Sequence, residues 1–168
     1  MENNNNQNEN VQSPAAETEV PYNTGKGILI ALIAAIAACG GWILIIRFVG
    51  FGLGGAVGGI LAAGCGMLVA SGYKAIGKPG AVGILVSAVF TFIAAAIATY
   101  VGTGIVLHSV GIGGGTFDAL YLLFEERIPG VPSSLFWQDF FVMVGIAVVA
   151  AIVFSFGGKK KKSTEQSA

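Results

Sequence analysis

Apolar residues fall into four long runs along this chain, and polar residues collect between and beyond them. The runs cover about 27–46, 49–73, 81–107 and 138–158, and the first three contain no charged side chain. Because a helix rises 1.5 Å per residue and the hydrocarbon core of a bilayer is about 30 Å thick, roughly 20 apolar residues cross it. The pattern therefore predicts four transmembrane spans.

The spans are expected to be helices, and the predicted fold class is all-α. Lipid offers no water to the backbone, so spanning segments are either helices or closed barrels. The runs are about twice as long as a barrel strand and do not alternate between apolar and polar residues. We therefore predict an integral membrane four-helix bundle over residues 26–158.

The loop between the third and fourth spans has a helical pattern of its own. Apolar residues recur there at helical spacing, at Phe117, Leu120, Tyr121, Phe124 and Ile128. Thr116 is the expected N-cap, and Pro129 with Gly130 ends the segment. We predict a short amphipathic helix over 117–128 that lies in the outer membrane interface. Phe136 and Trp137 follow as an aromatic belt at the entry of the last span.

Two polar segments flank the spans. Residues 1–25 are rich in asparagine and acidic, a composition typical of a disordered tail. Residues 159–168 begin with four lysines. This run is expected to anchor the topology and to touch anionic lipid.

The placement of charge orients the chain, although the net charge is zero. Threading four spans puts all seven lysines on one side and leaves Arg47 and Arg127 on the other. The positive-inside rule predicts that the lysine side is cytoplasmic. Both termini are therefore expected in the cytoplasm, and the protein is expected in the plasma membrane. The lysines predicted to act as topology anchors are Lys74, Lys78, Lys159, Lys160, Lys161 and Lys162.

Glycine is unusually frequent in the second span, where residues 50–66 hold eight glycines. Helices in a bilayer associate through close packing over small residues. Two neighbouring ridges at helical spacing are predicted to pack in this way, at Gly50, Gly54, Gly58, Ala62 and Gly66 and at Gly55 and Gly59. The expected partners are spans one and three, because span three carries a matching stripe at Gly83, Ser87, Thr91, Ala95 and Thr99.

The same glycines also match a phosphate-binding pattern, G-x-G-x-x-G, at Gly50, Gly52 and Gly55. The match lacks a preceding strand and a following acidic residue about 20 positions later, and it lies in a predicted span. Packing is the preferred interpretation.

No residues assemble a catalytic, cofactor-binding or metal-binding pattern. His108 and Ser71 are expected at opposite ends of the membrane, so these two residues cannot form a serine–histidine pair. We expect a non-enzymatic protein without a cofactor, acting as a scaffold or accessory subunit through helix packing. The expected partners are the bilayer and either a second copy or another membrane protein, and no nucleic acid.

The alternative is a small oligomeric transporter or channel. Coupled carriers usually place ionisable groups inside the membrane, whereas these spans contain only hydroxyls such as Ser87, Thr91 and Thr99. A continuous polar path through the bundle would favour transport. Hydroxyls that face other helices would favour the scaffold.

The two cysteines are not expected to form a disulfide, because Cys39 and Cys65 lie at different predicted depths, about 18 Å and 9 Å from the cytoplasmic ends of their helices. Residues 36–39 also resemble the lipobox that precedes a lipidated cysteine. The apolar run continues after Cys39, so an intact first span is preferred over cleavage there.

Several loose motifs occur together in an order that resembles a known family. They are GxxGAxxG, then Gly72, Tyr73, Lys74, Gly77 and Lys78, then FDAL at 117–120, then Trp137, Asp139 and Phe140. Over residues 28–156 the chain is similar to uncharacterised four-span integral membrane proteins found chiefly in Gram-positive bacteria. The resemblance implies the topology and a bacterial plasma membrane, and it implies no activity.

Overall fold

The computed structural model describes residues 22–49 and 56–157, and all regular structure in these ranges is helical. The elements are α1 (Thr24–Val49), α2 (Ala56–Lys74), α3 (Ala81–Ser109), α4 (Thr116–Phe124) and α5 (Ser133–Phe156). All but α4 are long and apolar enough to cross a membrane. The predicted all-α fold with four membrane-length helices is confirmed.

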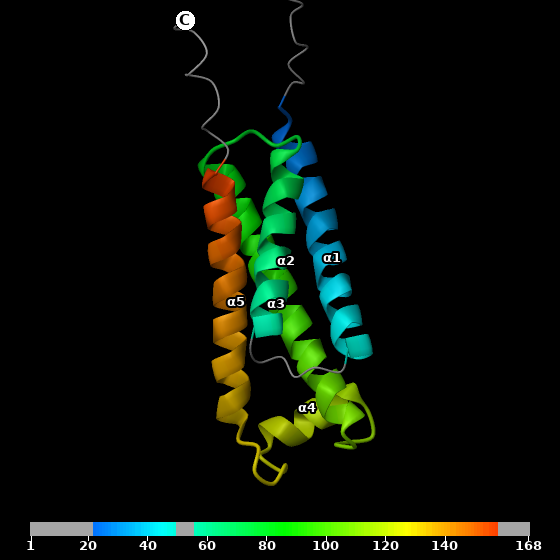
Figure 1. Cartoon of the computed structure of the whole chain (residues 1–168). Coiled ribbons are helices and arrows are strands. Elements are labelled where there is room, and N and C mark those ends of the chain that lie inside the picture. Colours follow the sequence, from blue (N-terminus) through cyan, green and yellow to red (C-terminus); the bar gives the residue numbers. More distant parts are fainter. Residues whose placement is uncertain (1–21, 50–55, 158–168) are drawn as a thin grey trace, which may run out of the picture.

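The four long helices lie side by side and alternate in direction (Figure 1). The start of α1, the turn between α2 and α3 and the end of α5 lie together at one end of the bundle, here called the terminal end. The short helix α4 lies at the opposite end, here called the α4 end. Both α2 and α3 pack against α1 and against α5, so these two helices form the middle of the bundle.

Small residues fill the contacts between the long helices. Nine alanines of the long helices are buried, at Ala31, Ala35, Ala62, Ala70, Ala94, Ala95, Ala98, Ala147 and Ala151. Large apolar side chains such as Leu29, Leu85 and Phe141 are exposed on the outside. This distribution suits lipid, where burying a large side chain gains nothing and close approach of the backbones gains dispersion contact.

One aromatic side chain, Tyr73, closes the terminal end of the bundle. Its ring is buried among glycines of three different segments, at Gly27 in α1, Gly77 in the turn and Gly83 in α3. A Cβ atom at Gly83 would lie 2.9 Å from ring atom Cδ1, and one at Gly77 would lie 2.6 Å from Cζ. The phenol donates a hydrogen bond to the Lys78 carbonyl at 3.4 Å. Because these three glycines have no side chains, the Tyr73 ring has the space that it occupies.

The helices begin and end at residues that differ from several predicted bounds. The first helix starts at Thr24 because the Asn23 side chain caps it, accepting the Lys26 N–H at 3.0 Å. The last helix starts at Ser133, five residues before the predicted start of the span, so Phe136 and Trp137 are helical. The predictions for most of the N-terminal tail and for 159–168 lie outside the described residues.

The short helix α4 differs from its prediction at both ends. Thr116 is its first residue and Gly115 is the N-cap, without a side-chain cap, so the predicted role of Thr116 is wrong. Asp118 instead accepts the Gly114 N–H at 2.6 Å. The helix ends at Phe124, four residues before the predicted end, because Glu126 adopts a left-handed φ of 55°.

A Schellman motif terminates α4 at this point. The Arg127 N–H donates to the Leu122 carbonyl at 2.9 Å, and the Glu126 N–H donates to the Leu123 carbonyl at 3.1 Å. The residue in the left-handed position is glutamate, although glycine is the usual choice there. The Glu126 carboxylate accepts a hydrogen bond from the Ser133 hydroxyl at 3.0 Å, which ties the end of α4 to the start of α5.

Candidate functional site: an aromatic groove at the α4 end

The position of α4 is set by a glycine of α3. A Cβ atom at Gly104 would lie 2.6 Å from the Thr116 carbonyl oxygen and 2.9 Å from Leu120 Cδ1. The absence of a side chain at Gly104 lets the two helices touch. Leu120 is buried in this contact together with Ala119 and Leu123 of the same helix. The loop between the two long helices is thus held against α3.

Two of the five apolar residues predicted to form one face of this helix do not pack against the bundle. Phe117 is 70% exposed and Tyr121 is 55% exposed, whereas Ala119, which was not in the predicted set, is fully buried. Ala119 instead lies against Gly113 of the preceding loop, where an added Cβ atom would come within 2.7 Å of the Ala119 nitrogen. The two aromatic rings therefore remain on the surface of the α4 end.

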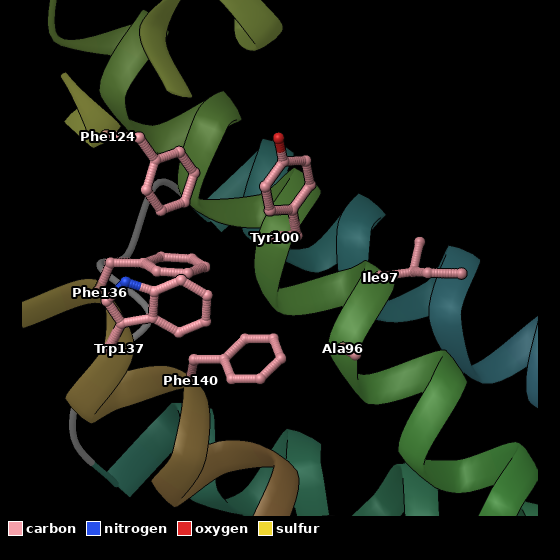
Figure 2. Close-up of a pocket in the computed structure, with 7 residues that line it drawn as sticks. All are labelled: Ala96, Ile97, Tyr100, Phe124, Phe136, Trp137 and Phe140. Atoms are coloured by element: carbon pink, nitrogen blue, oxygen red, sulfur yellow. The ribbon is translucent and has the colours of Figure 1, made fainter. Parts of the chain in front are cut away.

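An open groove of about 330 Å³ lies where α3, α4 and α5 meet (Figure 2). We call it the aromatic groove, and its lining residues are Ala96, Ile97, Tyr100, Phe124, Phe136, Trp137 and Phe140. The first three come from α3, one ends α4, and the last three come from the first two turns of α5. Five of the seven are aromatic. The groove therefore forms only where these three helices pack together.

The aromatic rings that line the groove also contact one another. Phe136 is buried at the centre, with its ring centroid 5.1 Å from Phe124, 5.2 Å from Trp137 and 5.6 Å from Phe140. The Phe124 and Phe136 rings meet edge to face at 87°. Edge-to-face pairs add about 0.5–1.5 kcal/mol beyond the area they bury. The cluster therefore fixes the end of α4 against the start of α5.

Charged residues lie beyond the groove, on the side of α4. Arg127 Nε is 2.9 Å from Glu125 Oε2, in an ion pair at the surface. A hydrogen bond with Glu125, and the charge of that carboxylate, raise the pKa of Tyr121 above its ordinary value. Exposed pairs of this kind contribute little to stability. They mark the polar rim above an apolar site.

A second feature of the bundle is a row of polar side chains inside it. Ser87, Thr91 and Thr99 of α3 are 1%, 0% and 0% exposed. Their hydroxyls, and the indole Nε1 of the buried Trp42, have no hydrogen-bond partner in the part of the chain that the structure describes. By contrast, the Thr103 hydroxyl donates to the Thr99 carbonyl at 2.9 Å, the usual arrangement in a helix.

The predicted glycine ridge of α2 lies in contact with α5. A Cβ atom at Gly66 would lie 2.8 Å from the Ala151 backbone nitrogen and would also meet the Ala147 carbonyl. Gly59 faces Ile146 of the same helix at 3.8 Å. Gly58 and Ala62 are buried, and Gly50, Gly52, Gly54 and Gly55 lie outside the described residues. At Gly59 and Gly66 the expectation that span one or span three is the neighbour is wrong, because α5 covers both glycines.

Contact with span one occurs on a different part of α2. A Cβ atom at Gly72 would lie 2.9 Å from Ala34 Cβ and 3.3 Å from the Ile30 carbonyl oxygen. Gly72 was not in the predicted ridge, although it belongs to the motif that carries the family resemblance. The two faces of α2 therefore use different glycines for different neighbours.

Two of the predicted topology anchors, Lys74 and Lys78, lie in the described residues, at the terminal end. Lys74 Nζ donates to the Phe154 carbonyl at the end of α5 and lies 5.1 Å from the centroid of the Phe154 ring. A cation at the C-terminus of a helix complements its dipole. Lys78 contributes its carbonyl to Tyr73, and Lys159–Lys162 lie outside the described residues.

The remaining candidate residues stay apart from one another. Ser71 lies near the terminal end and donates to the Leu68 carbonyl, whereas His108 lies near the α4 end, with Nδ1 3.3 Å from the Gly113 carbonyl oxygen. Cys39 and Cys65 are free, and Cys39 lies inside the unbroken helix α1. Within residues 22–49 and 56–157, no group of three histidine, cysteine or acidic side chains could hold a metal ion.

Sequence reasoning found part of the groove and missed the rest. Phe136 and Trp137 were expected as a belt, and Phe124 was expected on an amphipathic face, but nothing linked them to Tyr100. The sequence does contain one indication that Tyr100 lies near Phe136. Each of the two residues is about 20 residues from the terminal end of its helix, so they lie at a similar level in neighbouring helices. Comparison of the sequence with models of known families, with curated proteins and with solved structures found no match.

Proposed function

We propose that this chain is a non-enzymatic integral membrane protein that acts as a scaffold or accessory subunit through helix and loop contacts. The observation that carries the proposal is the enclosure of Ser87, Thr91 and Thr99 between helices. A carrier must present polar groups to water or to its cargo. Hydroxyls that face neighbouring helices instead serve contacts within the bundle.

The α4 end supplies the surface for such contacts. Phe117 and Tyr121 are one helical turn apart and both are largely exposed. Because Gly104 and the Schellman motif hold α4 in place, the two rings are presented by a fixed helix. Exposed aromatic residues on a rigid element are typical of a site for a partner.

The proposal includes an orientation. The lysines at the terminal end support a cytoplasmic position of that end under the positive-inside rule, and α4 is then on the outer side of the membrane. The resemblance to four-span proteins of Gram-positive bacteria supports a bacterial plasma membrane. Under this proposal a partner that uses Phe117 and Tyr121 approaches from outside the cell or within the outer leaflet.

The test is the mass of the particle purified in mild detergent. We expect native mass spectrometry to give a mass above the 17.1 kDa of one chain, from a second copy or another polypeptide. Replacing both Phe117 and Tyr121 by serine should return the mass to that of one chain. The matched control is Tyr22→Ser, because Tyr22 is an exposed aromatic residue at the terminal end. A single-chain mass for the unchanged protein contradicts the proposal.

One observation favours the alternative of an oligomeric transporter or channel. The hydroxyls of Ser87, Thr91 and Thr99 lack partners among the described residues, and unpaired polar groups attract water. Solute or ion flux into liposomes containing the purified protein tests this alternative. Flux that is lost when Thr91 is replaced by valine would replace the scaffold proposal, since the substitution removes the hydroxyl and keeps the shape.

A further inference from the structure

We infer that one ordered water molecule is bound inside the bundle, where it bridges the hydroxyls of Ser87 and Thr91 in α3. Both side chains are closed off from the surface, with exposed fractions of 1% and 0%. The inference does not use the partner contact proposed at Phe117 and Tyr121. A particle of one chain can contain the water and a particle with a partner can lack it, so the two proposals fail separately.

The two hydroxyls differ from other hydroxyls of the long helices. A serine or threonine within a helix can donate to a carbonyl three or four residues earlier in the same helix. Four side chains do so, at Ser71, Thr103, Ser109 and Ser155. Ser87 and Thr91 make neither this bond nor any other side-chain hydrogen bond within the described ranges. Buried polar groups are nearly always paired with protein or with ordered water, so these two hydroxyls indicate water.

The spacing of the two residues suits a single bridging molecule. Residues four apart lie on the same face of a helix, with Cβ atoms about 5–6 Å apart. A water molecule with hydrogen bonds of about 2.7–2.8 Å to two oxygens joins atoms up to about 5.5 Å apart. Buried waters typically make about three hydrogen bonds, and the Ser87 carbonyl oxygen, one turn before Thr91, has a lone pair for the third.

The Tyr73 ring shows which part of α1 lies beside the two hydroxyls. A Cβ atom at Gly27 of α1 would lie 3.3 Å from Cε2 of this ring, and one at Gly83 of α3 would lie 2.9 Å from Cδ1. Both helices run from the terminal end towards the α4 end (Figure 1). Residues equally far along from the two glycines therefore lie at the same level. Ser87 and Thr91 follow Gly83 by about 6 Å and 12 Å.

Alanines occupy these two levels of α1. Ala31 and Ala35 follow Gly27 at the same spacings, both are buried, and α1 packs against α3. An alanine side chain ends at its Cβ atom and covers little of the neighbouring helix. The two alanines therefore favour water, the smallest molecule that both donates and accepts hydrogen bonds, over any larger polar ligand.

Apolar groups close this position in both directions along α3. Towards the terminal end, the Tyr73 ring lies against Gly83. Towards the α4 end, the next residue at the same spacing is Ala95, which is fully buried. The next hydroxyl without a partner among the described residues is Thr99, about 12 Å beyond Thr91. One water cannot span that distance, so the site holds a single enclosed molecule and no continuous file.

A crystal structure at a resolution that shows ordered water tests the inference directly. We expect one water oxygen at about 2.7–3.0 Å from both Ser87 Oγ and Thr91 Oγ1. Thr91→Val removes one hydroxyl and keeps the shape of the side chain, so the water should be lost from this variant. The matched control is Thr103→Val, which should keep the water, because the Thr103 hydroxyl bonds to a carbonyl of its own helix.

Thermal unfolding in mild detergent gives a second readout. Loss of either hydroxyl removes the bridge, so the Tm shift of the Ser87→Ala, Thr91→Val double variant should be smaller than the sum of the two single shifts. The shifts of Thr91→Val and Thr103→Val should add, because these residues lie about 18 Å apart along α3 and share no partner. Additive shifts for Ser87 and Thr91 would contradict a shared water.

Three structures of the unchanged protein would overturn the inference, even where a variant does not fold. In the first, each hydroxyl donates to a carbonyl of its own helix and no water lies between them. In the second, Ser87 and Thr91 bond directly to each other. In the third, a continuous file of waters runs from Ser87 to Thr99, which replaces the single enclosed site and favours the transporter alternative.

Discussion

Replacing Gly66 by alanine should separate α2 from α5, because the added methyl group has no space. Its Cβ would lie 2.8 Å from the Ala151 backbone nitrogen and would also meet the Ala147 carbonyl oxygen. Both are backbone atoms of a helix, so neither can turn aside as a flexible side chain would. Overpacking of a tight site typically costs about 1–3 kcal/mol.

The same helix provides the control. Gly64 lies two residues away in α2, and a Cβ atom there would meet nothing within 4 Å. Gly64→Ala therefore adds the same methyl group with the same gain in helix propensity, up to about 1 kcal/mol, and no clash. The difference between the two variants isolates the contact between α2 and α5 from any effect of glycine on the helix itself.

Thermal unfolding in mild detergent, followed by circular dichroism, measures the difference. A change of 1 kcal/mol shifts Tm by about 2–4 °C for a chain of this size. We expect Gly66→Ala to unfold several degrees below the unchanged protein and Gly64→Ala to unfold at the same temperature or above it. Equal Tm values for the two variants would refute the close contact of α2 with α5.

Three further predictions follow from the two ends of the bundle. Gly83→Ala should cost about 1–3 kcal/mol, because the enclosed Tyr73 ring has no room to move away, and the same unfolding assay measures the loss. The Glu126→Gly protein should be more stable than the Glu126→Ala protein by about 1 kcal/mol. Both variants lose the hydrogen bond to Ser133, but only glycine adopts a φ of 55° without strain. Equal stabilities of the two variants would contradict this reasoning. In intact cells, a cysteine placed at Lys78 should resist an impermeant thiol reagent and one placed at Glu126 should react, because the positive-inside rule predicts that the lysines lie on the cytoplasmic side; the opposite pattern would reverse the proposed orientation.

The sequence by itself determined the number and kind of the long elements. A helix satisfies its backbone groups within one segment, so an apolar run of sufficient length specifies a spanning helix without reference to the rest of the chain. The existence of α4 was predictable for the same reason, because the spacing of Leu120 and Phe124 is a local property. The end of α4 was not, since a left-handed glutamate at position 126 has no sequence signal as strong as a glycine.

Only the tertiary structure decided which helix covers which face. Glycine and alanine stripes occur on α1, α2 and α3 alike, so their positions do not specify partners, and Gly66 contacts α5 although α5 was not the expected neighbour. The aromatic groove likewise needs Tyr100, Phe124 and Phe136 from three separate helices. A site made by residues far apart in the chain depends on how the helices pack together, and small residues permit that packing without encoding which helices will meet.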